Sequence, residues 1–434
     1  MCKKVITSEF VSYGHPDKIA DTIADSLLDA YLEQDKNTRA GIEVMVKDNN
    51  VVLGGEVSSN AIINYDTIVR DIFKGLDFPS NHNLNPENIK IINLIGKQSS
   101  EIHQGVDKSE NVIGAGDQGF VVGFASDDTD VYMPLGHYMA KKICQWVASQ
   151  RKLGLGPDTK SQVIVIRDDA TYENKVDYIL VSTMHTDDVD VKEVKAIIKK
   201  AIFNNTVGFN DDVFNNYIRG NEDIIEVVVN PCGAWHIGGP VSDCGVTGRK
   251  LVVDQYGGYS NIGGGFYGGK DYTKVDRSAA YMARYLAKNI VASGIAKTAK
   301  VELSYVIGVP EPSSINIELT GTKVDIDIDR LKEWIKKNID LTPYGIMKRF
   351  DYSYGRNGHT EINGFYGVDA STPALKAYYP WEKLDIANDI KNLRRLEAQI
   401  KGYPADICRD DTQLEQLIPT PKMIRTVITD SLTE

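Results

Sequence analysis

The segment after Gly14 has the hydrophobic spacing of a long helix. In PDKIADTIADSLLDAYLEQ, Pro16 occupies a first helical position, and apolar residues recur at intervals of three and four. These apolar positions are Ile19, Ala20, Ile23, Ala24, Leu27, Leu28 and Tyr31. Asp21, Asp25 and Asp29 recur every four residues on another face, which predicts a solvated acidic stripe. We therefore expect a helix with one buried face and one charged face.

Other stretches carry the β-branched patterns that are typical of strands. The runs 41–46 and 51–57 flank the turn-forming segment Lys47-Asp48-Asn49-Asn50, which predicts a hairpin. Further strands are expected at 90–94, 120–124, 162–167, 178–182 and 224–229. Helical patterns occupy 62–74, 135–152, 191–203, 275–294, 331–338 and, as an amphipathic helix, about 386–401. Because strands and helices alternate irregularly, the pattern predicts an α/β (α+β) fold with helices packed on mixed sheets.

Length and composition are those of a globular protein with several domains. The 434 residues exceed one ordinary hydrophobic core, and 42% hydrophobic with 25% charged residues are ordinary globular values. The composition shifts at the polar, glycine-bearing stretches 98–119 and 231–239. We divide the chain there into an N-terminal domain (1–100), a central domain (111–232), a C-terminal domain (233–385) and a helical extension (386–434).

The sequence gives no sign of a membrane partner or of an oxidising compartment. The start MCKKVITSEF lacks an apolar secretion region, and no stretch approaches the roughly 18 apolar residues of a membrane span. Five scattered cysteines without C-x-x-C spacing argue against a disulfide framework and a zinc site. We therefore expect a cytoplasmic protein with reduced thiols.

Positive charge is concentrated in one part of an acidic chain. The net charge is −11, yet five cations lie within thirty residues: Arg249, Lys250, Lys270, Lys274 and Arg277. They alternate with Asp243, Asp271 and Asp276 and with a triple glycine at 263–265. Local cations beside glycine backbone and carboxylates suit a polyphosphate with its metal ion. A nucleic-acid surface would spread its charge along a basic face, so we expect no nucleic-acid partner.

Two glycine motifs of familiar nucleotide folds occur here without their required context. Gly114 to Gly119 satisfies G-x-G-x-x-G but precedes the strand-like FVVGF instead of a helix. Gly264 to Lys270 satisfies G-x-x-x-x-G-K, but Asp271 stands where a P-loop needs Ser or Thr. Neither a dinucleotide fold nor a P-loop is expected.

The motif GHPDK places three polar side chains at the start of the predicted long helix. A helix N-terminus attracts anions through its free backbone N–H groups and its dipole. His15 could therefore donate to a leaving oxygen, and Asp17 could bind Mg²⁺, which takes one or two carboxylates beside substrate phosphates. Lys18 could offset phosphate charge or be an ordinary surface lysine.

Together with this motif, longer strings closely resemble the S-adenosylmethionine synthetase (methionine adenosyltransferase) family of bacterial and eukaryotic type. They cover most of residues 1–320 in family order and are GHPDKIAD, GGE (54–56), GKQS (96–99), QGVD (104–107), GAGDQG, PDTKSQV, IGGPVSDCGVTGRKLVVDQYGG, GGGFYGGKD and KVDRSAAYMARYLAKNIVASG. The resemblance implies that the adenosyl group of ATP is transferred to the sulfur of L-methionine, and that the released tripolyphosphate is cleaved to phosphate and pyrophosphate. It also implies three similar, interwoven domains around a pseudo-threefold axis. A homo-oligomer, a dimer or a dimer of dimers, would carry the active site between subunits.

The resemblance implies a role for each matching polar position. The implied catalytic groups are His15, Lys160, Arg249, Lys250 and Lys270, with His15 at the leaving oxygen. ATP would also contact Asp158, Ala234, Trp235, Asp243 and Phe266. Methionine would contact Glu56, Gln98, Asp243 and Lys274. Two Mg²⁺ ions per site, with Asp17 and Asp276 as ligands, and a K⁺ ion at Glu43 complete the implied site.

The chain departs from the family pattern near the implied nucleotide site. Ala234-Trp235 replaces a usual Arg-Phe pair, and Phe266 stands where a small residue is common. Trp235 can still stack on adenine, whereas Phe266 adds bulk. Two alternatives stay open: a phosphotransferase or polyphosphatase, opposed by the retained methionine contacts, and a catalytically silent relative, opposed by the retained His15 and Lys270.

Overall fold

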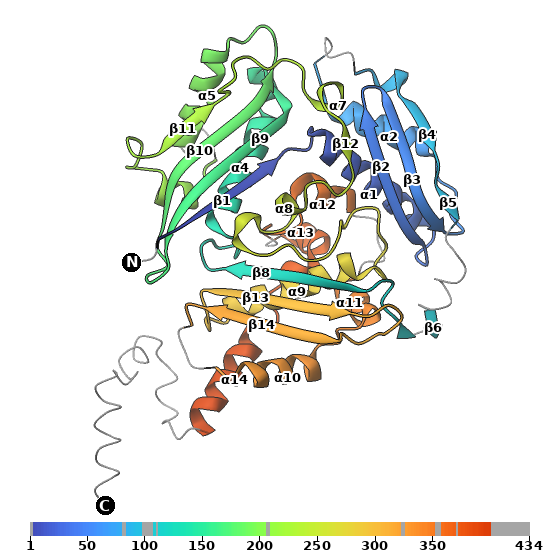
Figure 1. Ribbon diagram of the computed structural model, residues 1–434, viewed down its shortest axis with the longest axis vertical. Helices are drawn as coiled ribbons and strands as arrows, with labels where there is room; N and C mark the ends of the chain where they lie inside the picture. Colours follow the sequence, from blue (N-terminus) through green and yellow to red (C-terminus); the bar gives the residue numbers. More distant parts are fainter. Residues whose placement is uncertain are drawn as a thin grey trace, which may run out of the picture.

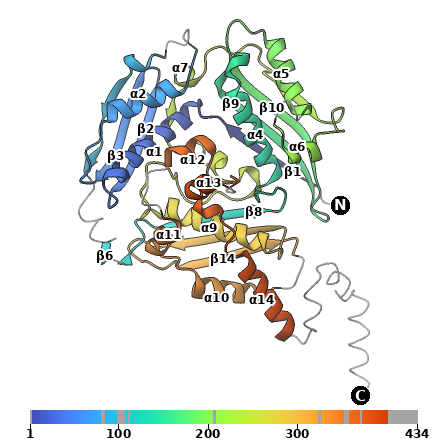
Figure 2. The same ribbon diagram turned by 180° about the vertical axis from the view of Figure 1, so that it is seen from behind.

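Three main sheets, two of them mixed and one antiparallel, surround the middle of the molecule, and each carries one long helix on its inward face (Figures 1 and 2). The structure, a computed structural model, describes residues 3–79, 84–97, 107–109, 112–204, 209–322, 326–351, 357–369 and 372–400. The three long helices are α1 (Pro16–Gln34), α4 (Leu135–Ser149) and α9 (Val275–Ala292). This arrangement confirms the predicted mixed α/β fold built from three similar units.

The first sheet has the strand order β12-β2-β3-β4, and β5 also pairs with β3. Its strands are β2 (Arg39–Lys47), β3 (Asn50–Ser58), β4 (Lys90–Asn93), β5 (Gly96–Lys97) and β12 (Gly245–Val246). The hairpin of β2 and β3 confirms the predicted one, with Lys47 paired to Asn50. Alternate residues of β2 face α1 and are buried, while Glu43 and Met45 point to the opposite face. Helix α2 (Tyr65–Gly75) follows β3 in the chain and contacts α1.

The second sheet has the order β1-β9-β10-β11 and packs on α4. It consists of β1 (Lys3–Val11), β9 (Leu155–Asp168), β10 (Asn174–His185) and β11 (Glu226–Val229), with helices α5 (Val191–Phe203) and α6 (Asp212–Tyr217) beside it. Helix α5 has the predicted bounds. Strand β1 escaped the pattern analysis because its buried face includes Ser8, which broke the apolar alternation.

The third sheet has the order β14-β13-β8 and packs on α9. Its strands are β8 (Gly119–Ser126), β13 (Thr298–Tyr305) and β14 (Ser314–Thr320), and helices α10 (Ile328–Asn338) and α11 (Pro343–Phe350) follow. Shorter elements are β6 (Asp107–Ser109), β7 (Val112–Ile113), α7 (Gly239–Ser242), α8 (Leu251–Asp254), α12 (Asn357–Asn363) and α13 (Pro373–Tyr378). Helix α14 (Ala387–Ile400) confirms the predicted helix after residue 386, while residues 401–434 lie outside the described part.

Strands distant in sequence share sheets, as the family resemblance implied. Strand β1, at residues 3–11, pairs with β9, which begins at residue 155. Strand β12, at residues 245–246, pairs with β2, and the other strands of that sheet all end before residue 98. The domain boundaries near residues 100, 111, 232 and 385 stay a prediction. They divide the sequence into blocks, whereas the sheets combine strands from different blocks. No helix in the described residues is long and apolar enough to cross a membrane.

The predicted acidic stripe on α1 is wrong. Asp21 and Asp25 have no solvent exposure, and Asp29 is half-buried. The carboxylates accept hydrogen bonds from backbone N–H groups of segments that cross the helix: two loops, at Gly248 and Gly269, and the start of α12, at Gly358. The polar face of α1 is therefore an interior surface that binds loops.

Candidate active site

His15 caps the N-terminus of α1, where β1 turns into the helix. Its Nδ1 accepts a hydrogen bond from the Asp17 backbone N–H at 3.1 Å, and only 2% of the residue is exposed. Burial, together with the positive charges of Lys250 and Lys160, lowers the pKa of His15 to about 3. The imidazole is therefore neutral near pH 7. Because Nδ1 accepts, the proton of the neutral ring resides on Nε2.

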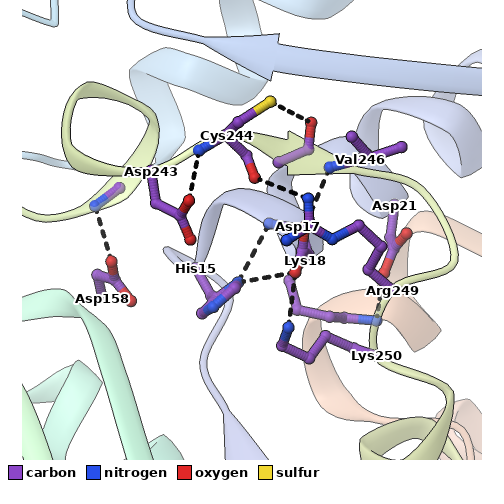
Figure 3. Close-up of polar contacts among 12 residues, drawn as sticks. His15, Asp17, Lys18, Asp21, Asp158, Asp243, Cys244, Val246, Arg249 and Lys250 are labelled. Carbon is purple, nitrogen blue, oxygen red and sulfur yellow. Dashed lines mark hydrogen bonds and ion pairs between the residues drawn. The ribbon is translucent and has the colours of Figure 1, made fainter.

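Asp17, in the first turn of α1, joins the helix to the loop that carries two of the predicted cations (Figure 3). Its Oδ2 lies 2.6 Å from Lys250 Nζ, its Oδ1 accepts from the Val246 N–H at 3.0 Å, and Arg249 Nε lies 3.5 Å from Oδ1. Burial alone would raise the pKa of Asp17, but the hydrogen bonds from Lys250 and Val246 outweigh it, so the pKa is lowered. The carboxylate stays ionised.

The loop before α9 places a second cation beside a second carboxylate. Lys270 Nζ lies 2.6 Å from Asp276 Oδ2, and Asp276 Oδ1 accepts from the Gly265 N–H at 2.8 Å. Lys274 Nζ lies 2.6 Å from Asp271 Oδ2. Lys270 and Asp276 remain partly exposed, so both can reach a bound molecule.

Strand β9 contributes Asp158 and Lys160 from the second sheet. Asp158 Oδ2 accepts from the Gly239 N–H at 2.7 Å, while its buried Oδ1 has no hydrogen-bond partner among the described residues. Burial raises the pKa of Asp158 to about 6. Asp243 lies on the same side of His15 as Asp158 (Figure 3), and Lys160 is exposed. Segments from the first and second sheets thus meet at His15.

Two predicted cations lie in the interior instead. Lys18 is 3% exposed and contacts three carboxylates, those of Asp21, Asp254 and Glu361, so it is not a surface lysine. Arg277 has no solvent exposure and forms a bidentate ion pair with Asp25, both N···O distances being 2.7 Å. Arg249, Lys250, Lys270 and Lys274 therefore make up the accessible part of the cluster.

The other predicted site residues lie in varied surroundings. Glu43 contacts the Thr247 hydroxyl, which connects β2 to the loop of Arg249 and Lys250. Glu56 is exposed on β3 opposite Gly41, and Gly41 forms a β-bridge with Lys270. Gln98 lies outside the described residues.

The Ala234-Trp235 pair and Phe266, which depart from the family pattern, differ in burial. The backbone N–H of Trp235 donates to His185 Nε2 at 3.3 Å, and its neighbour Ala234 is exposed. Phe266 is 6% exposed within the main hydrophobic core, where its ring and Cβ contact Gly268 and Gly248. The added bulk of Phe266 is therefore accommodated by neighbouring glycines.

Sequence reasoning missed that the side chains of Asp21, Asp25 and Arg277 form hydrogen bonds with the backbone of these loops. The four-residue spacing of aspartates was the available signal, but a spacing does not show which groups cover a helix face. Within the described residues, no group of three or more His, Cys, Asp or Glu side chains could hold a metal ion. Asp17 and Asp276 each offer one carboxylate beside a lysine, which suits Mg²⁺ that is shared with substrate oxygens.

Three S-adenosylmethionine synthetase models match this chain in order: the N-terminal domain over residues 3–100, the central domain over 112–235 and the C-terminal domain over 237–383. The S-adenosylmethionine synthase of Mycoplasma mycoides is 40% identical over 400 residues, covering 91% of this chain and 98% of that protein. That of Staphylococcus epidermidis is 40% identical over 408 residues, covering 90% and 98%. An S-adenosylmethionine synthetase structure from Campylobacter jejuni superposes with a TM-score of 0.77 at 34% identity, covering 90% of this chain and 99% of that one.

The relatives and the fold thus place the chain among enzymes of the transferase class. More particularly, the chain belongs to the S-adenosylmethionine synthetase family.

Proposed function

We propose that this protein is a cytoplasmic methionine adenosyltransferase, which forms S-adenosylmethionine from ATP and L-methionine and then hydrolyses the tripolyphosphate to phosphate and pyrophosphate. Family membership supports the overall reaction. The observation that carries the proposal is the convergence of neutral His15, ionised Asp17 and the cations Arg249 and Lys250 at one helix N-terminus.

The chemistry explains why the site holds cations rather than a catalytic base. The methionine sulfur has a free lone pair, so it can attack the 5′ carbon of ATP without first losing a proton. A C–S bond forms while the C5′–O bond breaks; sulfur becomes a sulfonium, and the bonding electrons leave on the triphosphate oxygen. Catalysis then depends on orientation and on stabilising the charge of the leaving group.

The residues of this chain divide that task. Nε2–H of His15 is assigned to donate to the departing oxygen, because Nδ1 is already engaged by the Asp17 amide. Arg249, Lys250 and Lys270, with Lys160 from β9, would bind the triphosphate. Asp158 and Asp243 would contact the nucleotide, and so would Ala234, Trp235 and Phe266. When bound, Mg²⁺ at Asp17 and Asp276 would neutralise phosphate charge, and K⁺ would lie at Glu43.

The methionine site is proposed at the end of the first sheet nearest Lys270. Glu56 faces Gly41 across the hairpin, and the bridge from Gly41 to Lys270 brings this strand end to the phosphate loop. Lys274 follows in the same loop. We assign Glu56, Lys274, Asp243 and Gln98 to methionine.

A homo-oligomer, a dimer or a dimer of dimers, is proposed to complete the site. Large apolar side chains are exposed on the sheets, including Met45 on the face of β2 away from α1, Ile92 on β4 and Phe120 on β8. Burying them against a second subunit would remove apolar surface from water. Glu43, the predicted K⁺ ligand, is exposed on the same face as Met45.

The reaction is tested by incubating purified protein with ATP, L-methionine, Mg²⁺ and K⁺. We expect S-adenosylmethionine to form, with phosphate and pyrophosphate released in equal amounts. Omitting methionine should abolish S-adenosylmethionine formation and most ATP consumption. ATP hydrolysis that is independent of methionine would instead favour the polyphosphatase alternative, and inactivity of folded protein would favour the silent relative.

The protonation state of His15 gives a separate prediction. Burial and the neighbouring lysines hold its pKa near 3, so from pH 8 to pH 5 the ring should stay neutral with the proton on Nε2. ¹⁵N NMR of histidine-labelled protein should show this tautomer, with the His15 signal assigned by its loss in His15→Asn. In urea the same signal should titrate near the ordinary histidine value of about 6.5. A folded-state midpoint above pH 5, or a proton on Nδ1, would contradict the assigned role.

A further inference from the structure

The aspartates of α1, taken in order along the helix, accept hydrogen bonds from backbone N–H groups that follow one another in the chain. Asp17 accepts from the Val246 N–H at 3.0 Å, Asp21 from Gly248 at 3.0 Å, Asp25 from Gly269 at 2.8 Å, and Asp29 from Asn357 and Gly358 at 2.9 and 2.8 Å. Gly248 directly precedes Arg249, and Gly269 directly precedes Lys270. The helix therefore binds the backbone next to the predicted triphosphate cations.

The backbone around Lys270 is held on both sides by one ion pair. Asp25 Oδ1 accepts from the Gly269 N–H and from Arg277 Nη1, at 2.8 and 2.7 Å. Arg277 Nη1 also donates to the Lys270 carbonyl oxygen at 3.2 Å, while Nη2 donates to Asp25 Oδ2 at 2.7 Å. The peptide group that precedes Gly269 and the peptide group that follows Lys270 thus both contact the same pair.

Packing leaves this backbone little room to move. Gly269 has φ +68°, and a Cβ there would lie 2.2 Å from the Ile42 carbonyl oxygen. The Gly269 carbonyl accepts in turn from the Ile42 N–H at 3.0 Å. Asp25 and Arg277 have no exposure to solvent, so water cannot replace their contacts. The loop lies fixed between α1 and β2.

Because Asp25 is paired with Arg277, its carboxylate does not draw the Lys270 ammonium away from Asp276. Arg277 neutralises Asp25, and burial of Arg277 is outweighed by that carboxylate, so the pKa of Arg277 is raised and the guanidinium stays charged. Lys270 Nζ points instead to the partly exposed Asp276.

We propose that the buried Asp25–Arg277 ion pair is a positioning device for Lys270, which sets the place from which that ammonium meets the leaving triphosphate. This inference rests on the proposed adenosyl transfer. Displacement of a catalytic group by about 1 Å can cost roughly 10²-fold in rate. Methionine binding, which does not use Lys270, should be affected little.

The test compares Asp25→Asn and Arg277→Lys with a control on the same helix, Asp29→Asn. Asp29 also accepts from backbone N–H groups through a partly buried carboxylate, but the residues that donate to it, Asn357 and Gly358 at the start of α12, carry no predicted substrate contact. Asp25→Asn and Arg277→Lys should each lower kcat about 10- to 100-fold with the KM for methionine nearly unchanged. Asp29→Asn should leave kcat unchanged.

A double-mutant cycle separates positioning from general loss of structure. In a Lys270→Ala background, Asp25→Asn and Arg277→Lys should cause almost no further loss of kcat, because the group that they position is gone. Circular dichroism and thermal denaturation establish that each variant is folded at the assay temperature. Losses that are additive with Lys270→Ala, or an equal loss in Asp29→Asn, would overturn the proposal. If folded wild-type protein forms no S-adenosylmethionine, the proposed function is wrong. If the wild-type protein is active but the variants show additive losses, only the positioning role of the ion pair is wrong.

Discussion

Replacing Lys270 by alanine is expected to lower kcat by about 10²- to 10³-fold, the usual cost of removing one preorganised group that stabilises transition-state charge. The KM for methionine should change far less. Lys270 Nζ lies at a partly exposed position beside Asp276, where it can leave the carboxylate and meet phosphate. Its charge matters most as the C5′–O bond breaks, since the leaving group then gains negative charge.

Steady-state and single-turnover measurements of S-adenosylmethionine formation would check this prediction. Lys270→Arg, which keeps the charge but changes its shape, should retain intermediate activity. Lys199→Ala, at an exposed position on α5, is the control and should behave as wild type. Equal losses in kcat and in methionine binding for Lys270→Ala would contradict the assignment to the leaving group.

Replacing Arg284 by methionine is expected to lower the free energy of unfolding by about 3–5 kcal/mol, the usual cost of breaking a buried ion pair from one side. Arg284 has no solvent exposure and pairs with Glu382 through two contacts of 3.1 Å. It also donates to the carbonyl oxygens of Phe124, Val131 and Tyr132. Methionine matches much of the volume but leaves these acceptors without their donor.

Denaturant unfolding followed by circular dichroism would measure the loss. Lys332→Met removes an ion pair with Asp329, whose carboxylate side chain is 88% exposed, so this control should cost under about 1 kcal/mol. Adding Glu382→Gln to Arg284→Met should lower the stability further, because it removes the carboxylate with which the buried Lys288 still pairs. A loss for Arg284→Met as small as that of Lys332→Met would show that Lys288, 2.6 Å from Glu382, suffices as its partner.

Much of the fold was predictable because local pattern and tertiary structure agree there. The hairpin of β2 and β3, helix α5 and the long helices α1 and α9 follow from spacing, turn residues and capping. Strands such as β1 were missed, since a buried Ser8 has no hydrophobic signal. Sharing of strands between distant segments also escapes periodicity, because pairing joins residues that are more than a hundred positions apart.

The sequence by itself determined the family, the presence of a local cationic cluster and the residues that supply it. It did not determine which charges face substrate: Arg277 and Lys274 are three residues apart, yet one is fully buried against Asp25 and the other remains partly exposed. Tertiary structure decided this, because loop N–H groups that lose water must find acceptors, and the aspartates of α1 are the acceptors that lie beneath these loops.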